Sequence, residues 1–98
     1  MPSQTVLFAI RLKEEADAMI RREATRRGEL VVLITRILES VDLSKVQAAR
    51  PLDVRDRPQT SVKLPKALHS KLKKTAIARS VSMNALLNGA ILKHFGKP

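Results

Sequence analysis

The sequence predicts a mainly α-helical domain that also contains a short two-stranded β ribbon. Two stretches, residues 5–12 and residues 59–64, alternate apolar and polar side chains, as half-buried strands do. Each stretch is followed by two segments with the apolar spacing of amphipathic helices. Because the order strand, helix, helix occurs twice, we predict two similar units whose strands pair within one chain.

The two predicted strands have matching faces. Their apolar sides carry Phe8, Ile10 and Leu12 in the first strand and Thr60, Val62 and Leu64 in the second. Their other sides carry Leu7, Ala9 and Arg11 in the first strand and Gln59, Ser61 and Lys63 in the second. Pro65 ends ladder pairing and suits the first turn of a helix. Since one strand cannot satisfy its backbone alone, we expect the two strands to pair with each other.

The first repeat continues with two helices. Residues 14–27 carry an apolar stripe, acidic residues crowd the first turn, and Gly28 is expected to end the helix at its C-terminus. The second helix begins near Leu30. Its apolar residues follow helical spacing and are Leu30, Leu33, Ile34, Ile37, Leu38 and Val41. Each helix is therefore predicted to bury one face.

The second repeat copies this pattern. A helix is predicted over residues 66–79, where Leu68, Leu72 and Ala76 lie 52 positions after Ala16, Ile20 and Ala24. The last helix lies 53 positions after its counterpart. Its stripe consists of Met83, Leu86, Leu87, Ala90, Ile91, His94 and Phe95. We predict one domain over residues 1–98, with the first repeat at 5–41 and the second at 59–95.

Residues 42–58 separate the repeats. Prolines and charged residues interrupt the apolar pattern there, as is typical of a linker. A short helical start is expected around Ser44–Ala49. An extended segment of this length reaches across a small domain, so the linker can bring the second strand back to the first.

The net charge of +10 favours a polyanionic partner, with solubility alone as the alternative. Residues 1–50 hold nine Lys/Arg and seven Asp/Glu, a net of +2, whereas residues 51–98 hold ten and two, a net of +8. The aromatic residues are only Phe8 and Phe95, so the base-stacking platforms of single-strand binders are missing. We therefore expect double-stranded DNA as the partner, bound mainly by the second half.

We expect no catalytic residues, no cofactor and no metal site. The chain has no cysteine, and His69 and His94 have no carboxylate at metal-ligand spacing. His94 lies on the apolar stripe of its helix, where we expect a packed histidine. Phosphate-binding loops and nucleophile motifs are missing as well. No apolar run is long enough for a membrane span and no signal-peptide pattern is present, so a cytoplasmic protein without membrane contact is predicted.

The ordered elements resemble the ribbon–helix–helix family of Arc-, MetJ- and CopG-type DNA-binding proteins. The matching residues of the second repeat are Val62-Lys63-Leu64-Pro65, Leu68, Leu72, Ala76, Ser82-Met83-Asn84, Leu86-Leu87 and Ala90-Ile91. Those of the first are Phe8-Ala9-Ile10-Arg11-Leu12, Ala16, Ile20, Ala24, Gly28, Leu33-Ile34 and Ile37-Leu38. With both halves in one chain, the sequence is similar to tandem, TraY-like conjugation accessory proteins. The resemblance implies an intramolecular pseudo-dimer.

The resemblance further implies that the polar face of the ribbon enters the major groove. The implied base-reading residues are Gln59, Ser61, Lys63, Arg11, Ala9 and Leu7. Lysine and arginine can donate to guanine, glutamine can pair with adenine, and apolar side chains can touch a thymine methyl group. For Leu7 and Ala9, packing under the linker or self-association of pseudo-dimers on DNA is an open alternative.

The resemblance also implies a phosphate clamp at the start of the last helix. The implied phosphate-binding residues are Ser82, Met83, Asn84, Lys66 and Arg79. Ser82 is a favourable N-cap, and the amides beside it can hold a phosphate, although a plain capping serine is an equal alternative. In the first repeat the matching position is Glu29, whose carboxylate would repel phosphate.

The expected function is sequence-specific binding of double-stranded DNA, as a transcriptional repressor or regulator. A plasmid relaxosome or conjugation accessory protein needs the same groove contacts and stays open. An antitoxin-type protein-binding module is the third alternative. Antitoxins of this family generally carry a further tail, whereas three residues follow Phe95 here, and we therefore rank this alternative last.

Overall fold

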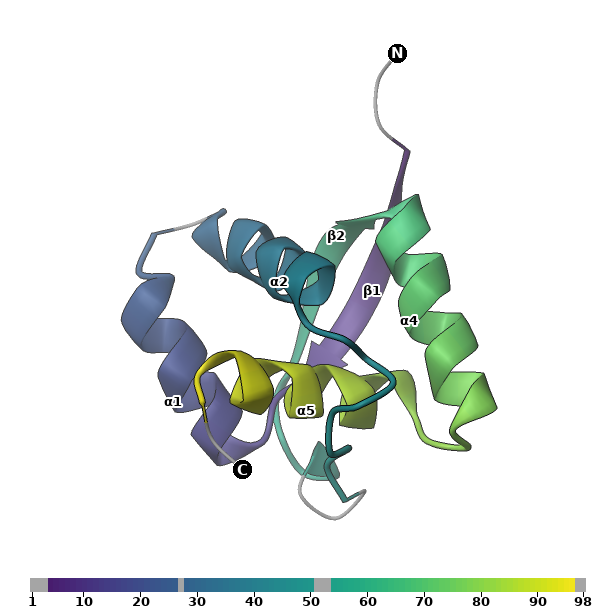
Figure 1. Ribbon diagram of the computed structural model, residues 1–98. Coiled ribbons are helices and arrows are strands. Elements are labelled where there is room, and N and C mark those ends of the chain that lie inside the picture. The colour runs from purple at the N-terminus through teal and green to yellow at the C-terminus, as the bar shows by residue number, and fades with distance from the viewer. Residues whose placement is uncertain (1–3, 27, 51–53, 97–98) are drawn as a thin grey trace.

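The computed structural model describes residues 4–26, 28–50 and 54–96, and its elements occur in the predicted order (Figure 1). The first unit comprises β1 (Thr5–Arg11), α1 (Glu14–Glu23) and α2 (Glu29–Ser40). The second comprises β2 (Gln59–Pro65), α4 (Lys66–Ala78) and α5 (Met83–His94). Two strand–helix–helix units therefore make up one chain.

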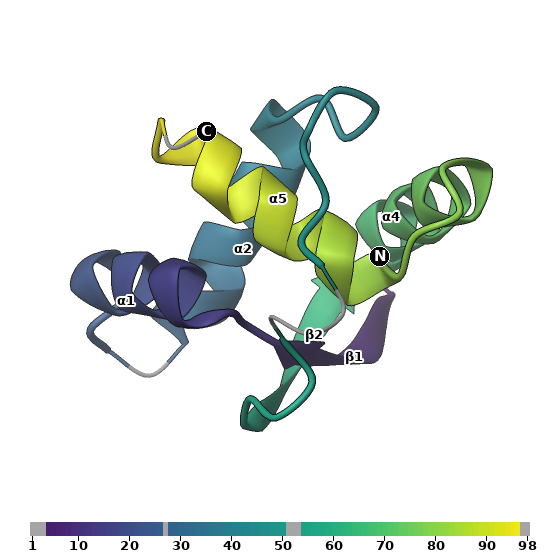
Figure 2. The ribbon, with the colours of Figure 1, turned by 90° about the horizontal axis from the view of Figure 1, so that it is seen from below.

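The two strands pair with each other as an antiparallel ribbon. Thr5 lies opposite Pro65 at one end, and Arg11 lies opposite Gln59 at the other. Figure 1 shows α1 and α4 on opposite sides of this ribbon, and Figure 2 shows α2 and α5 together on one of its faces. The prediction of an intramolecular ribbon–helix–helix-like arrangement is confirmed.

The core lies between the ribbon and the central helices. The inward strand residues Phe8, Ile10, Val62 and Leu64 are all buried. They pack with the buried faces of α2 and α5, which carry Ile34, Ile37, Leu38, Leu86, Leu87, Ala90 and Ile91. This packing leaves the other ribbon face outside the core, so the alternation in the strands separates a structural face from an outer face.

Helix α1 is shorter than predicted. It ends at Glu23, with Ala24 as its C-cap, rather than continuing to residue 27. Thr25 has low helix propensity, and Arg26 would lie one turn from Arg22, where like charges repel. Gly28 does not end α1; it has φ 92° and precedes α2 as its N-cap.

The linker is part of the core. Leu43, Val46 and Val54 are buried at 2%, 2% and 8% exposure, which the sequence pattern did not predict. The expected helical start around Ser44–Ala49 is wrong. Ser44 instead donates from its N–H and its hydroxyl to Asp42 Oδ1, at 3.0 and 2.6 Å, and this Asx turn competes with a helix.

The linker then runs along α5. The N–H of Ala49 donates to the carbonyl oxygen of Ala85 at 3.0 Å. The main chain of residue 47 passes over Gly89 in the middle of the helix. The segment therefore covers an apolar surface that α1, α2, α4 and α5 leave open.

His94 differs from its expected place. His94 is exposed rather than packed in the core, and its ring makes an edge contact with Phe95 at a centroid distance of 4.9 Å. His69 packs its ring edge-to-face against Phe8 at 5.6 Å. Among the described residues, no helix has the length and apolar character needed to cross a bilayer.

Candidate nucleic-acid interface

The antiparallel register gathers all six predicted base-reading residues on one surface, which we call the outer ribbon face. Three cross-strand pairs form it, namely Leu7 with Lys63, Ala9 with Ser61, and Arg11 with Gln59. In each strand these residues alternate with the buried ones, because successive side chains of a strand point to opposite sides. The surface is therefore a two-by-three grid of side chains.

Exposure is uneven across this grid. Gln59, Ser61 and Lys63 on β2 are exposed, whereas Ala9 and Arg11 on β1 are half-buried. Leu7 is 66% exposed, so it does not pack under the linker in the described part of the chain. A large apolar side chain thus stands beside a lysine on the outer ribbon face.

Arg11 is held at the end of the ribbon. Its Nη2 donates to Oε1 of its cross-strand partner Gln59 at 3.3 Å, and its Nη1 donates to the carbonyl oxygen of Arg55 at 3.1 Å. A guanidinium carries more N–H donors than these two bonds use. Arg11 can therefore keep this position and still donate to a base edge.

The predicted N-cap at Ser82 is confirmed. Its hydroxyl oxygen accepts from the N–H of Ala85 at 3.0 Å. The N–H groups of Met83 and Asn84 lie in the first turn, where a helix supplies no intrahelical acceptor, so they can point at an anion beyond the helix end. The side chain of Asn84 does not point there, because it is bonded to β1.

The start of α2 has a different chemistry. Gly28 is its N-cap, provides no side-chain cap, and is followed by Glu29. A carboxylate in the first turn occupies the position where a phosphate would be attracted. The N-terminal ends of α2 and α5 thus differ in capping and in charge, as the sequence indicated.

The other two predicted phosphate-binding residues have different surroundings. Lys66 is exposed at the first position of α4, directly after β2. Arg79 is half-buried, and its Nη1 donates to the carbonyl oxygen of Leu43 at 2.9 Å. Arg79 therefore anchors the linker, a role that the sequence did not indicate.

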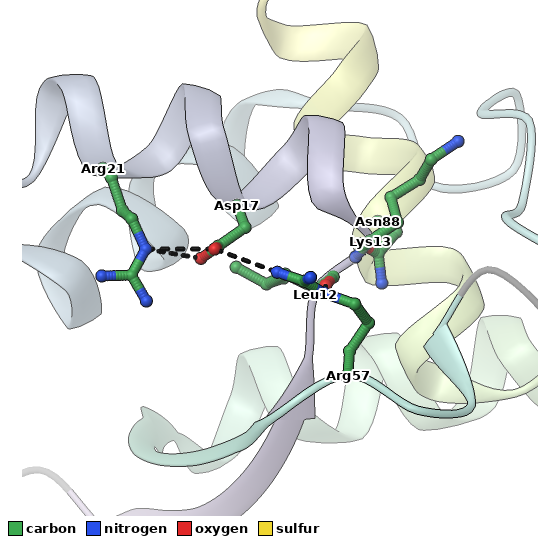
Figure 3. A network of polar contacts seen from close by, with 6 residues as sticks. All are labelled: Leu12, Lys13, Asp17, Arg21, Arg57 and Asn88. Atoms are coloured by element: carbon green, nitrogen blue, oxygen red, sulfur yellow. Dashed lines mark hydrogen bonds and ion pairs between the residues drawn. The ribbon is translucent and has the colours of Figure 1, made fainter.

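A second anchor fixes the linker beside the ribbon end (Figure 3). Arg57 Nε donates to the carbonyl oxygen of Leu12 at 2.8 Å, and its Nη2 contacts Asp17 Oδ2 at 3.1 Å. Asp17 also receives two bonds of 3.0 Å from Arg21 Nε. The Asp17 carboxylate therefore links α1 to the residues that lead into β2.

Sequence reasoning missed Asn88 of α5 as a site residue, and it assigned Asn84 to phosphate binding without predicting the bonds of its side chain to β1. Asn88 is completely buried, the one polar side chain so placed among the described residues, and both Asn84 and Asn88 are bonded to the main chain of residues 9–13. The available signal was their spacing of four, which puts them on one helix face, and the position of Asn88 inside an apolar run.

Within the described residues, no three metal-ligating side chains gather into a possible ion site. Comparisons with protein-family models, with curated proteins and with solved structures found no significant match to this chain.

Proposed function

We propose that this chain is a sequence-specific double-stranded DNA-binding protein that inserts its outer ribbon face into the major groove. The observation that carries the proposal is the register, which puts Arg11, Gln59, Ser61 and Lys63 on one face of a two-stranded ribbon. The major groove admits such a ribbon, and these side-chain types can pair with base edges there.

The charge and the helix ends support the same proposal. The net charge of +10 provides the electrostatic attraction that a phosphate backbone requires. The amides at the start of α5, next to Ser82, suit a phosphate at the edge of the groove. The strand–helix–helix arrangement resembles ribbon–helix–helix DNA-binding proteins, and membership of that family is part of the proposal.

The proposed biological role is that of a cytoplasmic transcriptional repressor or regulator. A conjugation accessory protein would use the same groove contacts, so the two roles differ in where the bound sequence occurs. A selected sequence within a promoter supports the repressor, whereas one beside a transfer origin supports the accessory protein.

The decisive experiment is selection of bound sequences from a random duplex pool, with the solution mass measured on the same sample. We expect a monomer that selects an asymmetric site, because the two half-ribbons differ. Affinity for the selected duplex should fall steeply between two salt concentrations, as counterion release requires. Absence of any selected sequence, or weak binding that salt does not change, overturns the proposal.

A further inference from the structure

The two asparagines of α5 bond to strand β1 in the way that a neighbouring strand would. Asn84 Oδ1 accepts from the N–H of Arg11 at 2.9 Å, and Asn84 Nδ2 donates to the carbonyl oxygen of Ala9 at 3.2 Å. Asn88 Oδ1 accepts from the N–H of Lys13 at 2.8 Å, and Asn88 Nδ2 donates to the carbonyl oxygen of Arg11 at 2.9 Å. Each side-chain amide thus replaces one peptide group of a strand.

These bonds fall on the edge of β1 that faces away from β2. An unpaired strand edge normally leaves a row of main-chain donors and acceptors without partners. Here Asn84 holds the N–H of Arg11, and Asn88 holds its carbonyl oxygen. Both main-chain polar groups of one residue are therefore fixed by one helix. Because Asn88 is 0% exposed, its bonds are shielded from competing water.

The arrangement is specific to one half of the pseudo-dimer. The positions of α2 that lie 53 residues before Asn84 and Asn88 are Val31 and Thr35. Valine has no amide, and among the described residues neither side chain bonds to β2. Asparagine side chains of α5 thus hold β1, whereas the described part of the chain has no equivalent bonds from α2 to β2.

We infer that Asn84 and Asn88 are positioning residues that present Arg11 to DNA, and that Arg11 is a specificity-determining residue. This inference rests on the proposed function. The guanidinium of Arg11 is held by Gln59 and by the linker carbonyl of Arg55. Its main chain is held by α5, so the start of α5 and the reading side chain form one rigid unit. Such preorganisation reduces the entropy lost when Arg11 meets a base.

The first test needs no DNA. Amide hydrogen exchange measured by NMR is expected to show protection of Arg11 and Lys13, although neither amide pairs with β2. Asn84→Ala, a half-buried position, should accelerate exchange at Arg11 by at least about tenfold, as loss of a protecting bond requires. Amides that pair with β2, such as that of Ile10, should change little. Unchanged exchange at Arg11 overturns the inference.

The second test resolves the effect by base position. Selection from a random duplex pool with Arg11→Ala identifies the base pairs whose preference depends on Arg11. Asn84→Ala should weaken preference at those same base pairs by about tenfold, within the range of one bidentate contact. It should spare the base pairs that Lys63→Ala identifies. Val31→Ala, at the matching position of α2, should leave the Arg11-dependent base pairs unchanged.

The outcomes separate the inference from the proposed function. An equal loss at all positions in Asn84→Ala would mean that the residue is only structural, and it would overturn the inference while duplex binding stands. The inference is likewise overturned, while duplex binding stands, if Arg11→Ala keeps every base preference of the unmodified chain. If the unmodified chain selects no sequence, the proposed function is overturned and the reading role of Arg11 with it.

Discussion

The main chain of Gln47 crosses helix α5 directly over Gly89. A Cβ on Gly89 would lie 2.9 Å from the carbonyl carbon of Gln47 and 3.4 Å from Cα of Ala48. The neighbouring bond from Ala49 to Ala85 fixes the crossing. Glycine is therefore needed here for close approach of two main chains, not for an unusual backbone angle.

This crossing predicts that Gly89→Ala destabilises the fold. In an open helix interior the same change stabilises by about 1 kcal/mol, but here the new methyl group meets backbone that cannot rotate away. We expect a loss of about 1–3 kcal/mol in the free energy of unfolding, measured by urea denaturation. Gln47→Ala should stay within about 0.5 kcal/mol of the unmodified protein, because only the main chain of Gln47 makes the contact. A more stable Gly89→Ala variant would contradict the crossing.

Ser80→Gly is predicted to stabilise the protein. Ser80 has φ 57°, and it ends α4 with the two bonds of a Schellman motif, from Ser80 N–H to Ile77 O and from Val81 N–H to Ala76 O. A left-handed residue costs about 1 kcal/mol more for serine than for glycine. Thermal or urea unfolding should show a gain of up to about 1 kcal/mol. Ser70→Gly, inside α4, should instead lose about 0.5–1 kcal/mol.

Most of the fold could be predicted from the sequence, because apolar residues are spaced differently along strands and along helices. The order of one strand pattern and two helix patterns also occurs twice. Phe8, Ile10, Val62 and Leu64 alternate along the strands, and this alternation alone decides which ribbon face is buried. The end of α1 could not be predicted, since Gly28 is compatible with either the end of one helix or the start of the next. The end of α1 is set by the backbone between the two helices, which the apolar pattern does not record.

The candidate site was predictable only in part. The outer ribbon face follows from alternation and register, which place all six residues on it, and their base-reading role stays a prediction. The roles of Asn84, Asn88 and Arg79 were not predictable, because their partners are main-chain groups more than 30 residues away in the chain. Every residue type carries a main-chain carbonyl and nearly every type an N–H group, so the sequence does not mark which residue is the partner of such a side chain.

The ion pair between Asp17 and Arg57 is predicted to contribute more than the pair between Asp17 and Arg21. The Arg57 and Asp17 side chains are 31% and 24% exposed, whereas that of Arg21 is 75% exposed. A double-mutant cycle with Asp17→Ala and Arg57→Ala should give a coupling of about 1 kcal/mol in urea denaturation. The cycle with Arg21→Ala should give about 0.3 kcal/mol, as exposed pairs one helical turn apart do. Equal couplings would contradict the anchoring role of Arg57.

The turn at Asp42 is predicted to depend on pH. The hydroxyl and N–H of Ser44 donate to the Asp42 carboxylate and lower its pKa below the ordinary value of 3.8, with smaller help from Lys45 and Lys71. A lowered folded pKa means that the contribution to stability is present above 3.8 and is lost as pH falls through the folded pKa. NMR titration of Asp42 should show this low pKa.

Ser44→Ala should raise the pKa of Asp42 toward 3.8, because it removes the hydroxyl donor. Ser40→Ala is the matched control, since the Ser40 hydroxyl donates to the carbonyl oxygen of Ile37 instead. The control should leave the titration of Asp42 in place. An unchanged midpoint in Ser44→Ala would refute the assigned cause.

Lys63→Ala tests the outer ribbon face within the proposed function. Lys63 is exposed and stands opposite Leu7 in the ribbon, so its removal leaves the core intact and circular dichroism should show unchanged unfolding. Affinity for the selected duplex, measured by fluorescence anisotropy, should weaken by about 1–3 kcal/mol. Affinity for a random duplex should fall much less, because base contacts rather than phosphate contacts provide specificity. Lys73→Ala, at an exposed position of α4, removes the same charge and should lower the affinity for both duplexes by a similar small amount. If Lys63→Ala behaves like Lys73→Ala, the ribbon supplies charge without reading sequence.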